Sequence, residues 1–345
     1  MKKLLFLFIS LIFLVGCEGD IPNKTEPSKT PTAATNPFPT DESVPEDTIV
    51  RLNRTMCYGK CPTYLLTVKA DGDVNFFGQH HTEVKGQKKY KIGCLCITEP
   101  FGGSDVAGMR TTAVKKGDKY ILNGSKTFIT NGVYSDYLVV VAKTNPEDKY
   151  KGMSIFVVDR ETPGISSTKL DKLGWRASDT AEIAFDNVEI PVENLMGEEG
   201  KGFPYVMQHF ALERLVMGIN AHARAEYAVD YAIKYMEERV AFGKSLDKFQ
   251  VLRHKIAEMA SRVDMCREYN YSIAKRLNDG IYVVKEASMS KLLSTKMADE
   301  VIYEALQLLG GYGYMEEYPM ARLLRDSRLG PIGGGTSEIL KEIIA

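Results

Sequence analysis

The sequence carries little net charge and few cysteines, and it has one long apolar run. Its 345 residues have a formal charge of -1, which excludes a broad basic surface for nucleic acid or anionic membrane. No Gly-x-Gly-x-x-Gly fingerprint convincingly follows a strand, so the Rossmann signal for a dinucleotide is absent. With 44% apolar residues, the chain can nevertheless bury a substantial core of two or three domains.

The apolar run lies at the N-terminus. Lys2 and Lys3 precede the run from Leu4 to Gly16, which is too short for a transmembrane helix but suits a secretion signal. The run ends at Cys17 in a sequence similar to a bacterial lipobox, so residues 1–17 are predicted to be a lipoprotein-type signal; a buried core helix is the alternative. Lipidation of Cys17 would anchor the protein in the envelope membrane, whereas an artefactual fusion would leave it cytoplasmic.

Two further segments precede the main part of the chain. Residues 18–47 contain six prolines among Thr, Ser and Asn and are predicted to be an extended tether. Residues 48–90 are predicted to form a small β domain, with Asp71-Gly72 as a hairpin turn. The pattern from Arg51 to Tyr64 resembles a small uncharacterised domain of bacterial envelope lipoproteins, for which no activity is implied.

The cysteines give only a weak metal signal. Cys57 and Cys61 have no second cysteine pair, and only His80 and His81 lie near them in the sequence. A disulfide is therefore favoured over zinc, and no metal site is predicted. The isolated cysteines of the later part are expected to be buried apolar side chains: Cys94, Cys96 and Cys266.

From residue 91 the pattern is that of an α+β protein. Residues 91–198 alternate short apolar segments with turn signals such as Asn123-Gly124, which predicts a β-barrel-like domain of mostly antiparallel strands. Residues 199–345 have a helical period, which predicts a four-helix bundle. The expected helices are Phe203 to Gly218, Ala221 to Arg239, Phe249 to Leu277 and Val284 to Leu309.

Six motifs occur in this part, and together they resemble the acyl-CoA dehydrogenase flavoprotein family, most closely its long-chain members. The resemblance covers about residues 91–345 and implies a β-domain followed by a four-helix domain. The motifs are Thr98-Glu99-Pro100-Phe101-Gly102-Gly103-Ser104-Asp105, Phe128-Ile129-Thr130-Asn131-Gly132, Leu212-Glu213-Arg214-Leu215, Arg239-x-x-Phe242-Gly243-Lys244, Gln307-x-x-Gly310-Gly311 and Ile332-Gly333-Gly334-Gly335-Thr336-Ser337-Glu338-Ile339.

The chain departs from the family at both ends. Members normally begin with a separate helical domain, and here the signal, the tether and the small β domain occupy its place. The sequence also stops inside what should be the final helix, so the C-terminal domain is expected to be shortened at its end.

The resemblance implies α,β-dehydrogenation of an acyl-CoA, which needs a base for the α-proton. Many members carry a Glu where this chain has Gly334, whereas long-chain and isovaleryl-type members use a Glu on the helix after the β-domain. Glu213 matches the second position, and apolar neighbours would raise its pKa towards a useful range. A solvated ion pair is the alternative reading of Glu213.

The remaining site residues also follow from the resemblance. Backbone N–H groups of Gly334 and Gly335 would bind the thioester carbonyl. The predicted substrate contacts are Ser104, Ala211, Leu212, Arg214, Gly334 and Gly335. The predicted FAD contacts are Leu95, Cys96, Ile97, Thr98, Ser104, Phe128, Ile129, Thr130, Arg239, Gln250, Gln307, Gly310, Gly311, Thr336 and Glu338, of which Arg239 to Gly311 are expected to act across a subunit interface.

The resemblance therefore implies an FAD-dependent acyl-CoA dehydrogenase of a long or branched chain substrate, working as a homo-oligomer with electron-transfer flavoprotein as its partner. The alternative is a catalytically dead remnant fused to a lipid-anchored envelope binding domain.

Overall fold

The computed structural model describes residues 48–54, 63–69, 74–80, 86–148 and 150–345. The predicted signal with Cys17, the tether, and the pair Cys57 and Cys61 lie outside these residues. Among the residues described, no helix is both long and apolar enough to span a membrane.

The segment before residue 91 forms a small sheet. Its strands are β1 (Thr48–Arg54), β2 (Thr63–Lys69), β3 (Val74–His80) and β4 (Gly86–Tyr90). Each strand pairs antiparallel with the next in chain order, which agrees with a hairpin between β2 and β3.

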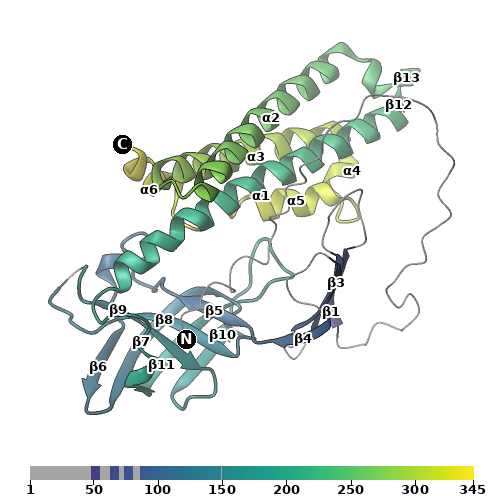
Figure 1. Ribbon diagram of the computed structural model, residues 1–345. Coiled ribbons are helices and arrows are strands. Elements are labelled where there is room, and N and C mark those ends of the chain that lie inside the picture. The colour runs from purple at the N-terminus through teal and green to yellow at the C-terminus, as the bar shows by residue number, and fades with distance from the viewer. Residues whose placement is uncertain (1–47, 55–62, 70–73, 81–85, 149) are drawn as a thin grey trace.

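A larger, curled sheet follows, and it lies below the helices in Figure 1. Its order is β10-β11-β7-β6-β8-β5, with β9 also pairing with β8. Most pairs are antiparallel, as predicted, but β8 pairs parallel with both β5 and β6. The strands are β5 (Gly93–Cys96), β6 (Thr112–Lys116), β7 (Lys119–Thr130), β8 (Tyr137–Lys143), β9 (Met153–Asp159), β10 (Ile165–Lys169) and β11 (Thr180–Pro191), with the single turns η1 (Val106–Gly108) and η2 (Val192–Asn194).

The inner face of this sheet forms a core with side chains that alternate along the strands. Tyr120, Leu122 and Phe156 are among its largest buried members, and Cys94 and Cys96 are buried there as expected. The predicted turn at Asn123-Gly124 is wrong, because β7 runs through it. Gly124 has φ +145, and a Cβ there would overlap Thr111, so the glycine permits a close approach inside a strand.

The helical part contains three long helices: α1 (Gly202–Glu238), α2 (Gln250–Asn278) and α3 (Val284–Leu309). The prediction of two helices between residues 203 and 239 is wrong, since α1 is continuous through Gly218. A Cβ at Gly218 would clash with Ser290 Oγ of α3, so this glycine serves helix packing rather than a break. The shorter elements are β12 (Val240–Ala241), β13 (Lys244–Ser245), η3 (Leu246–Lys248), α4 (Gly311–Tyr314), α5 (Pro319–Ser327) and α6 (Ser337–Ile344).

The sheet and the helices contact one another at the start of α1 and at Trp175. The N-terminal turns of α1 pack on β9, and Figure 1 shows α1 running from there to the β12–β13 hairpin at the other end of the helices. Trp175, in the loop before β11, donates from its backbone N to Asp326 Oδ1 (2.6 Å) and from Nε1 to Asp326 O (2.9 Å). The Arg224 guanidinium of α1 lies 4.4 Å from the centre of the Trp175 ring. We call this contact the Trp175 clamp.

A buried ion pair holds the segment after β5 against β7. Lys126 Nζ lies 2.8 Å from Glu99 Oε1 and also donates to Ile97 O, and the two side chains are 0% and 3% exposed. Glu99 accepts two further bonds, from the backbone N–H groups of Arg110 and Thr111. Burial acts to raise the pKa of Glu99, but Lys126 and these donors outweigh it and hold the pKa below its usual value. The pair therefore fixes the loop that begins at Thr98.

Replacing one member of this pair should be strongly destabilising. Lys126→Met leaves a buried carboxylate without its counter-ion, and we expect the free energy of unfolding at pH 7 to fall by about 3–5 kcal/mol in urea titrations. Adding Glu99→Gln to Lys126→Met should recover part of this loss. Lys119→Met, which removes the exposed pair Lys119–Glu189, should change stability by less than about 1 kcal/mol; equal losses for the two lysines would contradict the assignment.

Candidate active site

One face of α1 carries three side chains of interest, and the last of them lies at the glycine loop before α6. His209, Glu213 and Met217 are spaced four residues apart, so they follow one another along the same face. Met217 lies against the loop, since a Cβ on Gly334 would be 2.7 Å from Met217 Sδ. Glu213 is therefore one turn from the loop that the sequence analysis paired with it.

Glu213 has the electrostatic character of a general base. Burial raises the pKa of its carboxyl to about 7, against a smaller lowering by Arg214. Its side chain is 28% exposed, and its nearest ionisable contact is His209, with 3.7 Å between Nε2 and Oε1. Burial lowers the pKa of His209, which favours the neutral imidazole. Among the described residues, the ionisable partner of Glu213 is thus His209 and not the neighbouring Arg214.

Arg214 reaches both α3 and the glycine loop, since a Cβ on Gly335 would lie 3.9 Å from its Nη2. Its guanidinium donates to Ser288 Oγ (3.5 Å) and lies 5.7 Å from the centre of the Phe210 ring. Its Nε is buried without a hydrogen-bond partner among the described residues, as is His209 Nε2. Buried polar atoms of this kind are uncommon and call for a reason. Both flank Glu213, where a ligand could supply the missing acceptor or donor.

The loop from Gly333 to Gly335 presents unused backbone donors. Gly334 and Gly335 have φ values of +62 and +97, conformations that favour glycine. Within residues 150–345, no backbone acceptor is bonded to the N–H of either glycine. The conformation and the Met217 contact both oppose a side chain at Gly334, so the alternative position for a base is closed here.

The predicted flavin contacts on the sheet divide into accessible and buried side chains. Phe128 is 70% exposed with φ +58, an unfavourable conformation for an aromatic residue. Thr98 is beside it, because Thr127 N donates to Thr98 O (2.8 Å). The side chains of three predicted contacts are buried in the cores, so only their backbone could reach a cofactor: Cys96, Ile97 and Ile129. Leu95 is partly buried, whereas Thr130 and Ser104 are exposed.

A second group of predicted FAD residues gathers at the far end of α1. Arg239, Gln307, Gly310 and Gly311 line one hollow of about 660 Å³, where the Arg239 guanidinium lies 5.7 Å from the centre of the Tyr312 ring. Gln250 is exposed at the start of α2 and does not line the hollow. The rise per residue of an α-helix puts Glu213 and Arg239 about 39 Å apart. The proposed base and the far hollow therefore lie a long way apart in one chain.

Thr336 and Glu338 belong to the Glu213 end rather than to this hollow. Thr336 caps α6 by accepting from Ile339 N (3.4 Å), and Glu338 lies in the first turn. This capping accounts for both residue types without a ligand. Their place next to Gly335 nevertheless leaves them beside the candidate site.

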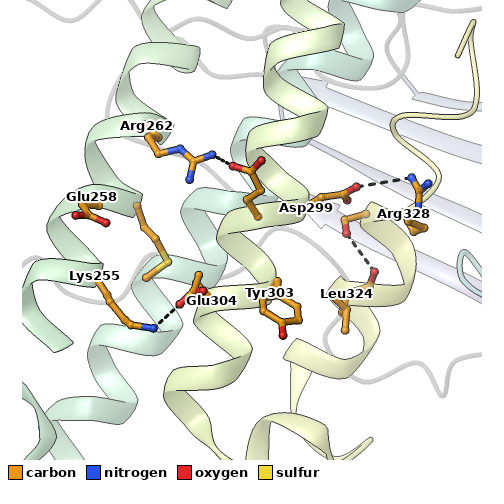
Figure 2. A pocket seen from close by; sticks show the side chains of 11 residues that line it. Lys255, Glu258, Arg262, Asp299, Tyr303, Glu304, Leu324 and Arg328 are labelled. Carbon is orange, nitrogen blue, oxygen red and sulfur yellow. Dashed lines mark hydrogen bonds and ion pairs between the residues drawn. The ribbon is translucent and has the colours of Figure 1, made fainter. Parts of the chain in front are cut away.

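A charged hollow between α2, α3 and the end of α5 contains none of the predicted site residues. Figure 2 shows that its charges face one another. Lys255 pairs with Glu304 at 2.6 Å, Arg262 pairs with Glu300, and Asp299 lies 3.8 Å from Arg328. These internal pairs leave little charge for a ligand.

Sequence reasoning missed three residues of the site: His209, Met217 and Lys291. Spacing by four from Glu213 could have indicated the first two. Lys291 is fully buried and donates from Nζ to Gly335 O (2.5 Å), and burial and the nearby Arg214 lower its pKa to about 8. A lone lysine in a helix carries no sequence signal for such a contact.

Comparison with known proteins identifies the family. Residues 94–188 match the acyl-CoA dehydrogenase middle domain and residues 200–345 match the acyl-CoA dehydrogenase C-terminal domain. The chain is 42% identical over 255 residues to an acyl-CoA dehydrogenase of Bacillus subtilis, covering 74% of this chain and 67% of the relative. The chain belongs to the acyl-CoA dehydrogenase family. Residues 48–94 match a domain of unknown function (DUF6438).

Other relatives agree. The mitochondrial long-chain specific acyl-CoA dehydrogenase of Mus musculus is 43% identical over 262 residues, covering 74% of this chain and 60% of the relative. A solved acyl-CoA dehydrogenase from Geobacillus kaustophilus superposes with a TM-score of 0.72 at 46% identity, covering 73% of this chain and 67% of that one. This chain thus spans about 60–67% of the length of these relatives. The predicted enzyme class and the predicted cofactor, FAD, are confirmed at the level of the family.

The residues present fit FAD. An exposed aromatic ring at Phe128 with the hydroxyls of Thr98 and Thr130 nearby suits a flat heteroaromatic ring system that also needs hydrogen bonds. Arg239 in the far hollow suits a diphosphate. In these positions the sheet residues would hold the flavin ring of one FAD, and the far hollow would hold the adenosine end of an FAD bound mainly to another copy of the chain.

Removing the charge of Glu213 should stabilise the protein at alkaline pH. Folding raises the pKa of Glu213 from 4.5 to about 7, so the folded protein holds this proton more tightly than the unfolded chain. Glu213 therefore lowers the free energy of unfolding as the pH rises from 4.5 to about 7. Without acyl-CoA, Glu213→Gln should therefore raise the unfolding free energy at pH 8 by about 1–3 kcal/mol and leave it unchanged near pH 4.5. Glu237→Gln, on an exposed residue of the same helix, should show no such difference; a loss of stability at pH 8 for Glu213→Gln would indicate a stabilising ion pair instead.

Proposed function

We propose that this chain is an FAD-dependent dehydrogenase of acyl-CoA thioesters with Glu213 as the base. The observation that carries the proposal is the position of Glu213, whose pKa is about 7, one helical turn from Met217 and the glycine loop. The N–H groups of Gly334 and Gly335 in this loop have no backbone acceptor within residues 150–345. A base and an oxyanion site are the two protein groups that this reaction requires.

The reaction begins with the removal of the α-proton. Glu213 in its charged form accepts this proton, and its raised pKa makes the carboxylate basic enough to do so near neutral pH. Bound FAD supplies the acceptor for the hydride that leaves Cβ. The N–H groups of Gly334 and Gly335 would donate to the thioester oxygen as negative charge develops on it.

The substrate is proposed to be a long or branched acyl chain. This class is supported by relatives whose names specify long-chain and isovaleryl-CoA substrates, at 43% and 41% identity. Ser104, Ala211, Leu212 and Arg214 are the proposed contacts. Ser104 is exposed and Leu212 partly exposed, while Ala211 and Arg214 are buried, so the last two would shape the wall of the site rather than its opening.

The rival function is a dead remnant joined to a lipid-anchored binding domain. It is not favoured, because the base, the loop donors and the flavin-facing residues are all retained in a consistent arrangement. Anchoring through Cys17 stays a prediction of the sequence, since that residue lies outside the described part of the chain.

Replacing Glu213 should block the chemistry and spare the cofactor. Glu213→Gln keeps size and polarity but cannot take the proton, so reduction of bound flavin by a long-chain acyl-CoA should slow by about 10²–10⁴. In the unaltered protein the rate should rise with pH through a midpoint of about 7, because only charged Glu213 is active. Stopped-flow absorbance of the flavin measures both. Glu237→Gln serves as the matched control, and reduction of Glu213→Gln at the unaltered rate would refute the assignment.

The proposed enzyme is a homo-oligomer that passes electrons to an electron-transfer flavoprotein. The oligomer is supported by the separation of about 39 Å between Glu213 and Arg239, since the far hollow would then serve the site of another copy. Phe242, at the tip of the adjoining β12–β13 hairpin, is almost fully exposed with φ +51, an arrangement suited to contact outside the chain. The electron acceptor is supported by the family alone.

Two inactive variants should complement each other. Glu213→Gln disables the base and Arg239→Glu repels the diphosphate, so each variant alone should be inactive. When the two variants are refolded together, about half of the dimers are mixed. In each mixed dimer, one of the two sites joins an intact Glu213 with an intact Arg239 from the other copy, so about a quarter of all sites should be active. Activity and FAD content of the mixture measure this. Complete inactivity of refolded mixed dimers would show that each site belongs to one chain.

A further inference from the structure

The glycine loop has few constraints of its own. Ile332 N and Gly333 N donate to Leu329 O, and Ser337 N donates to Pro331 O. Between these bonds, within residues 150–345, Lys291 Nζ to Gly335 O is the one hydrogen bond that holds Gly334 and Gly335. Two consecutive residues with left-handed φ values thus depend on a single tether from α3.

The tether is an unusual use of a lysine. Lys291 is 0% exposed, and no carboxylate in the described part of the chain lies within ion-pair distance of it. Burying an amine without a counter-ion is unfavourable, and the neighbouring Arg214 adds charge of the same sign. Replacing a buried charged group by an apolar residue of similar size is often neutral or stabilising, so the amine of Lys291 calls for a functional reason.

The geometry connects Lys291 to the proposed oxyanion site. A Cβ on Gly334 would lie 3.6 Å from Lys291 Cε, so the aliphatic part of the lysine side chain lies next to this loop. The N–H groups of Gly334 and Gly335 in the loop have no backbone acceptor within residues 150–345. We propose that Lys291 is a positioning residue, whose amine holds the Gly334–Gly335 loop so that its N–H groups face the thioester oxygen. The proposal rests on the proposed dehydrogenase function for its catalytic consequence, but not for the contact itself.

The test compares Lys291→Met with Lys296→Met in the full chain with FAD. Both substitutions remove an amine from α3, but Lys296 is exposed. Hydrogen–deuterium exchange of residues 329–336 without substrate should become about tenfold faster in Lys291→Met alone. The rate of flavin reduction by saturating long-chain acyl-CoA should fall by about 10², while the affinity for acyl-CoA changes less than about threefold, because the lost interaction is made in the transition state.

Unchanged exchange in residues 329–336 would overturn the proposal, and so would faster exchange with an unaltered reduction rate. If Lys291→Met does not fold, Lys291→Gln, whose side chain is one bond shorter, should show the same pattern. If the unaltered protein binds FAD but is not reduced by any acyl-CoA, the dehydrogenase function fails, while the exchange comparison still decides whether Lys291 holds the loop.

Discussion

The packing of α1 against α3 is the constraint on which the other features depend. Small residues of α1 face α3, from Gly218 against Ser290 to the buried Ala221, Ala225 and Ala232, and they let the two backbones approach closely. This contact fixes Glu213 on one helix relative to Lys291 on the other. The glycine loop then lies against both, through Met217 and through Lys291. The geometry of the site is thus a property of the helix pair.

The electrostatics of the site follow from the same packing. Glu213 and Arg214 are neighbours in sequence, yet a helix turns them about 100° apart, so Arg214 bonds to Ser288 while Glu213 lies beside His209. The separation is what permits burial to dominate the pKa of Glu213. A direct ion pair between the two would have kept the carboxylate a poor base.

The sequence was a good guide to elements and a poor one to burial. The mostly antiparallel sheet and the long helical segments follow from periodicity, and the family motifs gave the candidate residues. The sequence predicts a helix end at Gly218 and a turn at Asn123-Gly124, whereas both glycines allow another segment to approach closely. A turn and a close backbone contact both favour glycine, so the sequence alone does not distinguish them. Lys126 and Lys291 carry no local signal, since only the folded chain shows that their amines are enclosed. The accessible and buried members of the flavin motifs likewise separate only in three dimensions.

The Trp175 clamp has a consequence for the space between the sheet and the helices. With the start of α1 packed on β9 and Trp175 bonded to Asp326, the two halves are joined at separate points, and Arg224 covers the second joint. Two separated joints remove the hinge that a single connection would allow. Residues of the sheet and of α1 that act on one ligand therefore need not be brought together by the closure of two freely moving domains, which lowers the entropy cost of binding.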